Sequence, residues 1–200
     1  MMEVKNRFYF WIRRIAGPVF KLFFPLDVKG LENVPDEPVV LCGNHSSALD
    51  PIMVVAAESP TFSMRIMAKQ QLMKIPVVGW FLRKMGAFGV DRGNSDINAV
   101  KTSIRALRDG CHLLIFPEGT RVKEGETVEI KGGAAMIAVR AGVRMLPVFI
   151  DRKKRLFSKT RIIFGRPYEP VYTGRKGTAE EYQANAEEIM RRVYELGETE

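Results

Sequence analysis

Short apolar runs alternate along this chain with segments of helical periodicity, and this alternation limits its possible folds more than any other feature. Strands are predicted at residues 39–42, 62–67, 112–116, 145–150 and 161–164. Helices are predicted at residues 51–57, 95–108 and 133–140, and a capping box at 178–181 opens a terminal helix that ends at Gly197. This alternation predicts an α/β fold, in which a mainly parallel or mixed sheet is flanked by helices.

Residues 1–27 differ from the rest of the chain because aromatic side chains are mixed there with Arg and Lys, and few acidic residues occur. Charges interrupt every apolar run well short of the ~18 to 20 residues that a membrane-spanning helix needs. We therefore expect amphipathic helices, broken near Gly17 and Pro18, that lie in a membrane interface ahead of an α/β domain at 28–200. A helix packed on the protein's own core is the alternative.

The charge of the chain indicates an anionic partner. Its 200 residues carry a formal net charge of +8. Such a balance suits nucleic acid, an anionic membrane face or phosphorylated substrates, and it does not choose among them.

Residues 38–51 form the first candidate site. An apolar run ends at Gly43, His45 follows on a loop, and Asp50 with Pro51 starts a helix, where the aspartate is predicted to be the N-cap. This strand, loop and helix path can fold Asp50 back toward the imidazole. A carboxylate bonded to one ring nitrogen would leave the other nitrogen to take a proton from a hydroxyl group. The alternative is a capping aspartate beside an ordinary loop histidine.

Residues 116–121, Phe-Pro-Glu-Gly-Thr-Arg, form the second candidate site at the end of another predicted strand. Gly119 lets the backbone approach a ligand closely, and Arg121 offers a fork of donors suited to phosphate. Glu118 can accept from a substrate hydroxyl or fix a neighbouring arginine. Ligands of α/β sheets bind where strands end, which favours one shared site for both motifs. A solvated surface turn is the alternative.

Two further blocks occur with these motifs in a fixed order, at residues 86–92 (Gly-Ala-Phe-Gly-Val-Asp-Arg) and 146–148 (Leu-Pro-Val). With all four in view, the chain resembles the lysophosphatidate (1-acylglycerol-3-phosphate) acyltransferase family over roughly residues 30–168. The Asn-His-x4-Asp and Phe-Pro-Glu-Gly-Thr-Arg blocks match that family's pattern in full. The block at 86–92 departs from it at Gly89, where many members carry a larger apolar residue.

The resemblance implies roles for individual residues. His45 and Asp50 would be catalytic, as general base and as its orienter. The residues implied to bind the substrate are Lys69, Arg92, Glu118, Gly119 and Arg121. Within this set the two arginines would hold the acceptor phosphate, and Lys69 is a phosphate-binding candidate by its position only.

The activity implied is transfer of a fatty acyl group from acyl-CoA or acyl carrier protein to the sn-2 hydroxyl of 1-acylglycerol-3-phosphate, which forms phosphatidate in phospholipid biosynthesis. No cofactor is expected beyond the acyl donor, and nucleic acid is not expected as a partner. The chain is expected to act at the cytoplasmic face of the cell membrane, as a peripheral or monotopic protein on an anionic surface. Alternatives are a lipid hydrolase using Ser46, Ser47 or Cys42, an acyltransferase for another lysophospholipid, or a basic binding module.

The remaining distinctive residues have structural interpretations. Cys42 and Cys111 lie in apolar runs and are predicted to be buried reduced thiols, and His112 is predicted to be a core residue. Two histidines and two scattered cysteines predict no metal site. Residues 69–85 suit a second membrane-facing element, the lip of an acyl-chain groove or a core helix broken at Pro76. The basic residues of 152–161 suit an anionic lipid, an acidic carrier or a solvated loop.

Overall fold

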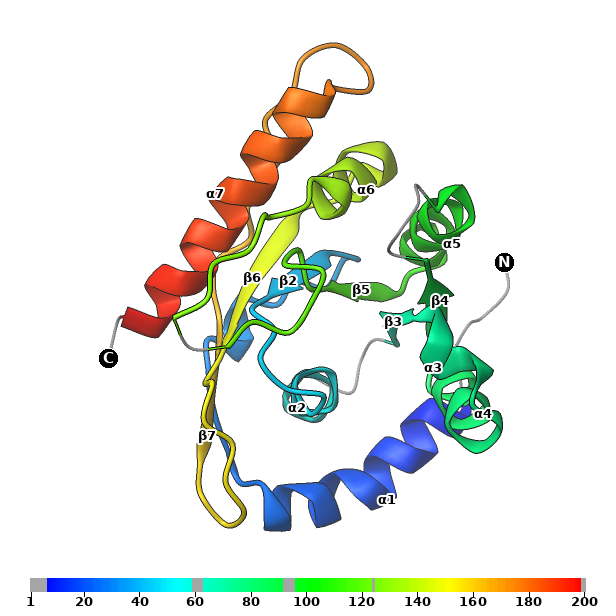
Figure 1. Ribbon diagram of the computed structural model, residues 1–200, viewed down its shortest axis with the longest axis vertical. Coiled ribbons are helices and arrows are strands. Elements are labelled where there is room, and N and C mark those ends of the chain that lie inside the picture. The colour runs from blue at the N-terminus through cyan, green and yellow to red at the C-terminus, as the bar shows by residue number, and fades with distance from the viewer. Residues whose placement is uncertain (1–6, 59–62, 92–95, 124, 199–200) are drawn as a thin grey trace.

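The computed structural model describes residues 7–58, 63–91, 96–123 and 125–198. Within these residues seven strands form one sheet in the order β1-β7-β6-β2-β5-β3-β4 (Figure 1). The strands are β1 (Leu26–Lys29), β2 (Val40–Gly43), β3 (Met64–Lys69), β4 (Ala87–Val90), β5 (His112–Ile115), β6 (Met145–Ile150) and β7 (Thr160–Phe164). Every neighbouring pair is parallel except β6 and β7, so the predicted mixed sheet is confirmed.

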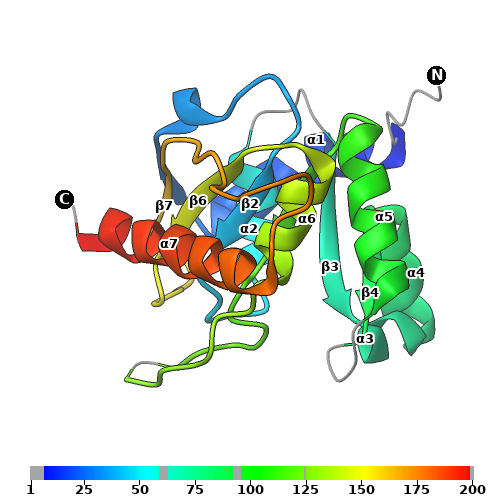
Figure 2. The same cartoon turned by 90° about the horizontal axis from the view of Figure 1, so that it is seen from above.

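Helices cover both faces of this sheet. They are α1 (Arg7–Phe23), α2 (Asp50–Ala57), α3 (Gln70–Lys74), α4 (Pro76–Lys84), α5 (Ile97–Arg108), α6 (Gly133–Ala141) and α7 (Ala179–Glu198). Helices α5, α6 and α7 lie side by side on one face, and α1 and α2 lie on the other (Figures 1 and 2). Helices α3 and α4 stand at the β4 edge. The result is the three-layer α/β arrangement that the alternating pattern predicts.

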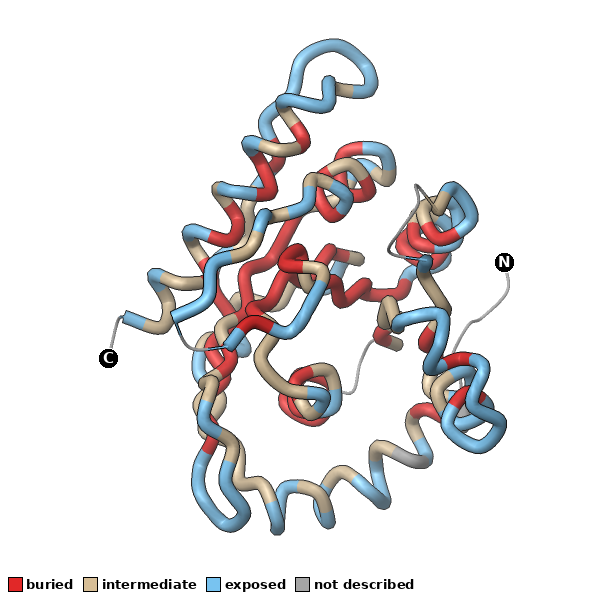
Figure 3. The backbone as a smooth tube through the Cα atoms, viewed as in Figure 1, coloured by how far each residue is buried: buried red, intermediate tan, exposed pale blue. Residues whose placement is uncertain are grey.

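The centre of the sheet is buried from both sides (Figure 3). In β2, Val40 and Cys42 pack toward the cluster under α6 and α7, whereas Val39 before the strand and Leu41 pack toward the cluster under α1 and α2. Alternate side chains of a strand point to opposite faces, so an unbroken apolar run is needed where both faces are covered. This explains why the central strands were recognisable as apolar runs.

Strands β1 and β4 were not predicted. Each has four residues and lies at an end of the sheet, where most of its side chains are only partly buried. β1 carries Asp27 and Lys29 and so has no apolar run, whereas the apolar run of β4, Ala-Phe-Gly-Val, is only four residues long and contains a glycine. Of the predicted elements, 145–150 agrees with β6 and the others differ by one or two residues at one or both ends. The predicted starts at Phe62 and Ser95 lie outside the described residues.

Helix α1 runs unbroken through Pro18, so the predicted break at this residue is wrong. Tyr9 before the proline is 1% exposed, and Phe20 after it also packs on the α2 side of the sheet. Both halves are therefore held to the core, which compensates for the backbone hydrogen bond that proline cannot donate. No helix within the described ranges is both long and apolar enough to cross a bilayer.

Candidate active site

The loop that leaves β2 is held from two sides. The Asn44 side chain, 1% exposed, donates to the Ile150 carbonyl and accepts from the Ile150 N–H, each at 2.8 Å. The carbonyl of His45 accepts from the N–H of Val122 at 2.8 Å. These bonds tie the loop to the end of β6 and to the segment after β5, so the backbone of His45 has a fixed position at the sheet edge.

His45 and Asp50 meet as the sequence predicts. The distance from His45 Nδ1 to Asp50 Oδ2 is 3.0 Å, and the ring stacks on Phe116 with centroids 4.2 Å apart. Engagement of Nδ1 leaves Nε2 as the ring nitrogen able to accept a proton. The His45 side chain is 12% exposed and that of Asp50 is fully buried.

Asp50 is the first residue of α2 rather than its N-cap, which is Leu49. The carboxylate turns away from the helix and accepts the N–H groups of Ser46 and Ser47, each at 2.7 Å. The N-cap prediction is therefore wrong by one residue. The loop, and not the first turn of α2, supplies the donors that orient this carboxylate.

Lys154 is a third member of the cluster that sequence analysis missed. Its Nζ lies 2.6 Å from Asp50 Oδ1 and donates to Ser46 Oγ at 2.6 Å, and its side chain is 5% exposed. Burial alone would raise the pKa of Asp50. Hydrogen bonds from His45 and Lys154, with the charge of the lysine, outweigh this effect and hold that pKa below its usual value.

Glu118 joins the two sequence motifs. Its Oε2 accepts the backbone N–H of His45 at 2.6 Å, and its Oε1 accepts the hydroxyl of Tyr194 on α7. Glu118 is 2% exposed, and this burial raises the pKa of its carboxyl group. The hydrogen bonds from Tyr194 and His45 act in the opposite direction but do not outweigh the burial. Tyr194 was not anticipated, although it lies in the terminal helix that the capping box at 178–181 predicts. That Glu118 also contacts substrate remains a prediction.

The other predicted substrate residues fall as follows. Strands β2, β5 and β3 are parallel neighbours, so Lys69 at the end of β3 shares an edge with His45 and Glu118, and it is exposed. Gly119 has a φ of 66°, in the left-handed region that favours glycine. Arg121 is exposed on the same loop. Arg92 lies outside the described residues.

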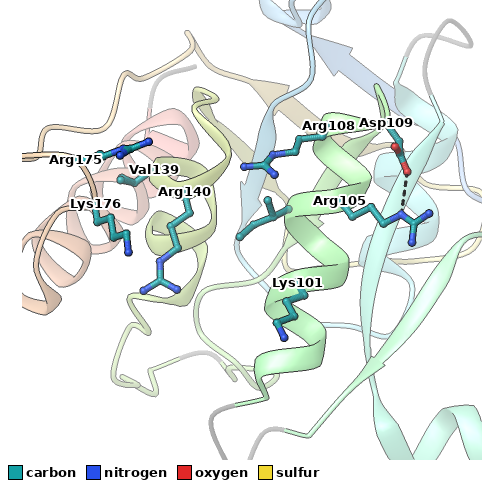
Figure 4. A pocket seen from close by; sticks show the side chains of 9 residues that line it. Lys101, Arg105, Arg108, Asp109, Val139, Arg140, Arg175 and Lys176 are labelled. Carbon is teal, nitrogen blue, oxygen red and sulfur yellow. Dashed lines mark ion pairs between the residues drawn. The ribbon is translucent and has the colours of Figure 1, made fainter. Parts of the chain in front are cut away.

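A cavity of about 850 Å³ between α5 and α6 is a separate feature (Figure 4). It is lined by Lys101, Ile104, Arg105, Arg108, Asp109, Val139, Arg140, Arg175 and Lys176. Arg108 and Arg140 lie in the last turns of α5 and α6. Both helices run back from the edge that carries His45, so the cavity is not part of the His45 cluster. No group of three or more His, Cys, Asp or Glu side chains suited to a metal ion occurs in the described part of the chain.

The chain is similar in sequence and in fold to known proteins. Residues 25–151 match the family model described as Acyltransferase. A 1-acyl-sn-glycerol-3-phosphate acyltransferase of Bacillus subtilis is 33% identical over 171 residues, which cover 82% of this chain and 84% of that protein. The chain therefore belongs to the 1-acyl-sn-glycerol-3-phosphate acyltransferase family.

Other relatives match over a smaller share of their length. A chloroplastic 1-acyl-sn-glycerol-3-phosphate acyltransferase of Arabidopsis thaliana is 30% identical over 149 residues, 72% of this chain and 41% of that protein. The match covers 53% of the Pseudomonas aeruginosa relative, at 29% identity over 71% of this chain. The crystal structure of PlsC, the 1-acyl-sn-glycerophosphate acyltransferase of Thermotoga maritima, superposes with a TM-score of 0.68 at 27% identity, covering 96% of this chain and 79% of that one.

Proposed function

We propose that this chain transfers a fatty acyl group from acyl-CoA or acyl carrier protein to the sn-2 hydroxyl of 1-acylglycerol-3-phosphate and so forms phosphatidate. The observation that carries the proposal is the contact between His45 Nδ1 and the buried carboxylate of Asp50 at the edge where strands β2, β5 and β3 end. The names of the relatives supply the substrate class.

The proposed reaction needs no covalent enzyme intermediate. Nε2 of His45 takes the proton of the acceptor hydroxyl as its oxygen attacks the thioester carbonyl. Asp50 stabilises the imidazolium that forms, in the way the acid of a catalytic triad does. The tetrahedral intermediate then expels the thiolate, which takes the proton from the imidazolium, and phosphatidate and a free thiol leave.

Among the described residues, no hydrogen bond joins the ring of His45 to the hydroxyl of Ser46 or Ser47, which favours direct transfer over a hydrolase mechanism that pairs a serine with this histidine. The Ser46 hydroxyl accepts from Lys154, and that of Ser47 accepts the N–H of Leu49 at 3.2 Å. Cys42 is completely buried, and burial raises the pKa of its thiol well above the usual value, so it stays protonated. Trapping an acyl group on a serine or cysteine of this chain would favour the hydrolase instead.

Arg121→Ala should raise the KM for lysophosphatidate by roughly 10- to 100-fold, because a hydrogen bond to a charged group contributes about 1.5–3 kcal/mol. Steady-state kinetics with the acyl donor held constant would measure it. Arg140→Ala is the matched control, since Arg140 is exposed in the last turn of α6. An unchanged KM and kcat in Arg121→Ala would contradict the phosphate-binding role.

We also propose that the chain rests on the cytoplasmic face of the cell membrane, as a peripheral or monotopic protein on anionic lipid. Three segments expose large apolar side chains. In Figure 1 the β6–β7 loop lies at the lower left, α1 runs along the bottom, and α3 and α4 lie at the right. These residues, here called the apolar face, are Trp11, Ile15, Val19 and Leu22 of α1, Leu156 and Phe157 between β6 and β7, and Leu72, Ile75, Val77 and Trp80 of α3 and α4.

Two observations support a bilayer as the occupant of the apolar face. The rings of Phe23 and Phe157 lie 5.7 Å apart, so α1 and the β6–β7 loop form a continuous surface. Arg14, Lys21 and Lys74 are exposed on the same segments, as expected beside anionic head groups. The exposure of α3 and α4, where only Met73 and Gly79 are buried, contradicts the core-helix alternative for residues 69–85.

Replacing Trp80 or Trp11 by serine should weaken binding to vesicles that contain anionic lipid by roughly tenfold or more for each, since burial of a large apolar side chain contributes about 1.5–3 kcal/mol. Co-flotation with vesicles of mixed neutral and anionic phospholipid measures this. Ile97→Ser is the matched control, because Ile97 is 65% exposed on α5, away from the apolar face. Equal loss in all three variants would contradict the proposed orientation.

A further inference from the structure

We propose that Lys154 is a positioning residue of the acyl-transfer site, which holds the carboxylate of Asp50 in place and supplies a positive charge that opposes a second positive charge on the imidazole of His45. The inference rests on the function proposed above and adds a residue to its machinery. It starts from the contacts of one buried ammonium group, whose partners are Asp50 Oδ1 and Ser46 Oγ, both at 2.6 Å.

The burial of Lys154 sets it apart from its neighbours. Its side chain is 5% exposed, whereas Lys153 and Arg155 are exposed in the same loop. A charged side chain is rarely buried unless it is paired, because its removal from water is costly. The carboxylate of Asp50 therefore stabilises Lys154 in its buried position. The conformation of the β6–β7 loop brings this lysine, and not its two neighbours, to the contact between His45 and Asp50.

The two oxygens of Asp50 have separate partners. Oδ2 accepts from His45 and from the N–H groups of Ser46 and Ser47, and Oδ1 faces Lys154. The carboxylate is therefore held by hydrogen bonds at Oδ2 and by the ion pair with Lys154 at Oδ1. Since Oδ2 is in turn what orients the ring of His45, the lysine acts on the base through the aspartate.

The same contact sets the charge of the cluster. Asp50 and Lys154 together are neutral, so a proton on His45 would leave a net positive charge in a buried place. Without the lysine, the imidazolium and the carboxylate would form a stable neutral pair. The other groups that face His45 are the uncharged ring of Phe116 and Glu118, whose pKa is raised by burial and which has Tyr194 and the charge of Arg152 near it.

Lys154 offers little surface to a substrate phosphate, because its partners Asp50 and Ser46 both belong to the protein and its side chain is 5% exposed. A phosphate-binding lysine would act mainly on the KM for the acceptor. A positioning lysine should act on kcat and on its dependence on pH. These two roles therefore give different kinetic results.

The first test compares the pH profiles of kcat/KM for wild type, Lys154→Met, Lys154→Arg and the control Lys29→Met, in which an exposed lysine of β1 is removed. We expect the acidic limb of Lys154→Met to move up by about one pH unit or more, because protonation of the imidazole no longer meets an opposing charge. In Lys154→Arg the positive charge is kept, so the acidic limb should return most of the way to its wild-type position. Lys29→Met should match wild type. An acidic limb that does not move, with activity lost in proportion to thermal stability, would show that Lys154 is only structural.

A second test does not depend on turnover. The chain has two histidines, and His45→Ala identifies the NMR signals of His45. In the Lys154→Met protein the ring signals of His45 should change at higher pH than in wild type, whether or not the protein transfers acyl groups. Identical titrations would overturn the inference, and absence of acyl transfer in the wild type would overturn only the function.

Discussion

Replacement of His45 by alanine should reduce acyl transfer to lysophosphatidate by roughly 10² to 10⁴-fold while the fold survives. A positioned general base contributes about this much to a rate, and among the described residues His45 supplies the side-chain hydrogen bond to Asp50 Oδ2. The loss should appear in kcat more than in the KM of either substrate. Initial rates of phosphatidate formation over a range of acceptor concentrations would measure it.

Two controls accompany the alanine variant. Circular dichroism and thermal unfolding establish that the variant folds, which is expected because Asn44 and Glu118 hold the loop through contacts that do not involve the imidazole. His45→Gln retains a polar side chain of similar size and should be equally inactive. Wild-type rates in a folded His45→Ala protein would remove the basis of the proposed mechanism.

Asp50→Asn should be both inactive and unstable. Activity should fall by about 10² to 10⁴-fold because the amide no longer stabilises the imidazolium or fixes its tautomer. Stability should fall by roughly 3–5 kcal/mol, because Lys154 remains as a buried cation without its carboxylate. Chemical denaturation measures the second effect independently of the first.

The surface pair of Arg105 and Asp109 supplies the comparison for Asp50→Asn. Its atoms are 3.7 Å apart and both side chains are well exposed, so Asp109→Asn should cost less than about 1 kcal/mol and leave activity unchanged. Equal destabilisation by the two substitutions would mean that the contact with Lys154 contributes no more than a surface ion pair.

The central strands could be predicted from sequence, and the edges of the sheet could not. β2 and β6 are buried on both faces, which requires unbroken apolar runs that can be recognised in the sequence. β1 is short and interrupted by Asp27 and Lys29, and the apolar run of β4 is only four residues long and contains a glycine, so neither was recognised as a strand. The prediction of a helix break at Pro18 was wrong because Tyr9 and Phe20 pack on the core and hold α1 on both sides of the proline. Such contacts form between distant parts of the chain and cannot be recognised in the local sequence.

The candidate site was predictable where its residues lie close together in sequence. His45 and Asp50 are five residues apart on one strand, loop and helix path, and their contact was expected and is found. Lys154 and Ser46 are separated by 108 residues, and Tyr194 and Glu118 by 76. Only the folded sheet brings such pairs together. In the sequence Lys154 could therefore not be distinguished from the other basic residues of its loop.

The most direct measurement is the identity of the lipid that the purified protein makes. The chain would be incubated with detergent-dispersed lysophosphatidate and, in separate reactions, acyl-CoA and acyl carrier protein donors, and the products identified by mass. The account predicts phosphatidate that carries the donor's acyl chain, and none from His45→Ala. Free fatty acid alone, or phosphatidate formed equally by the variant, would contradict it.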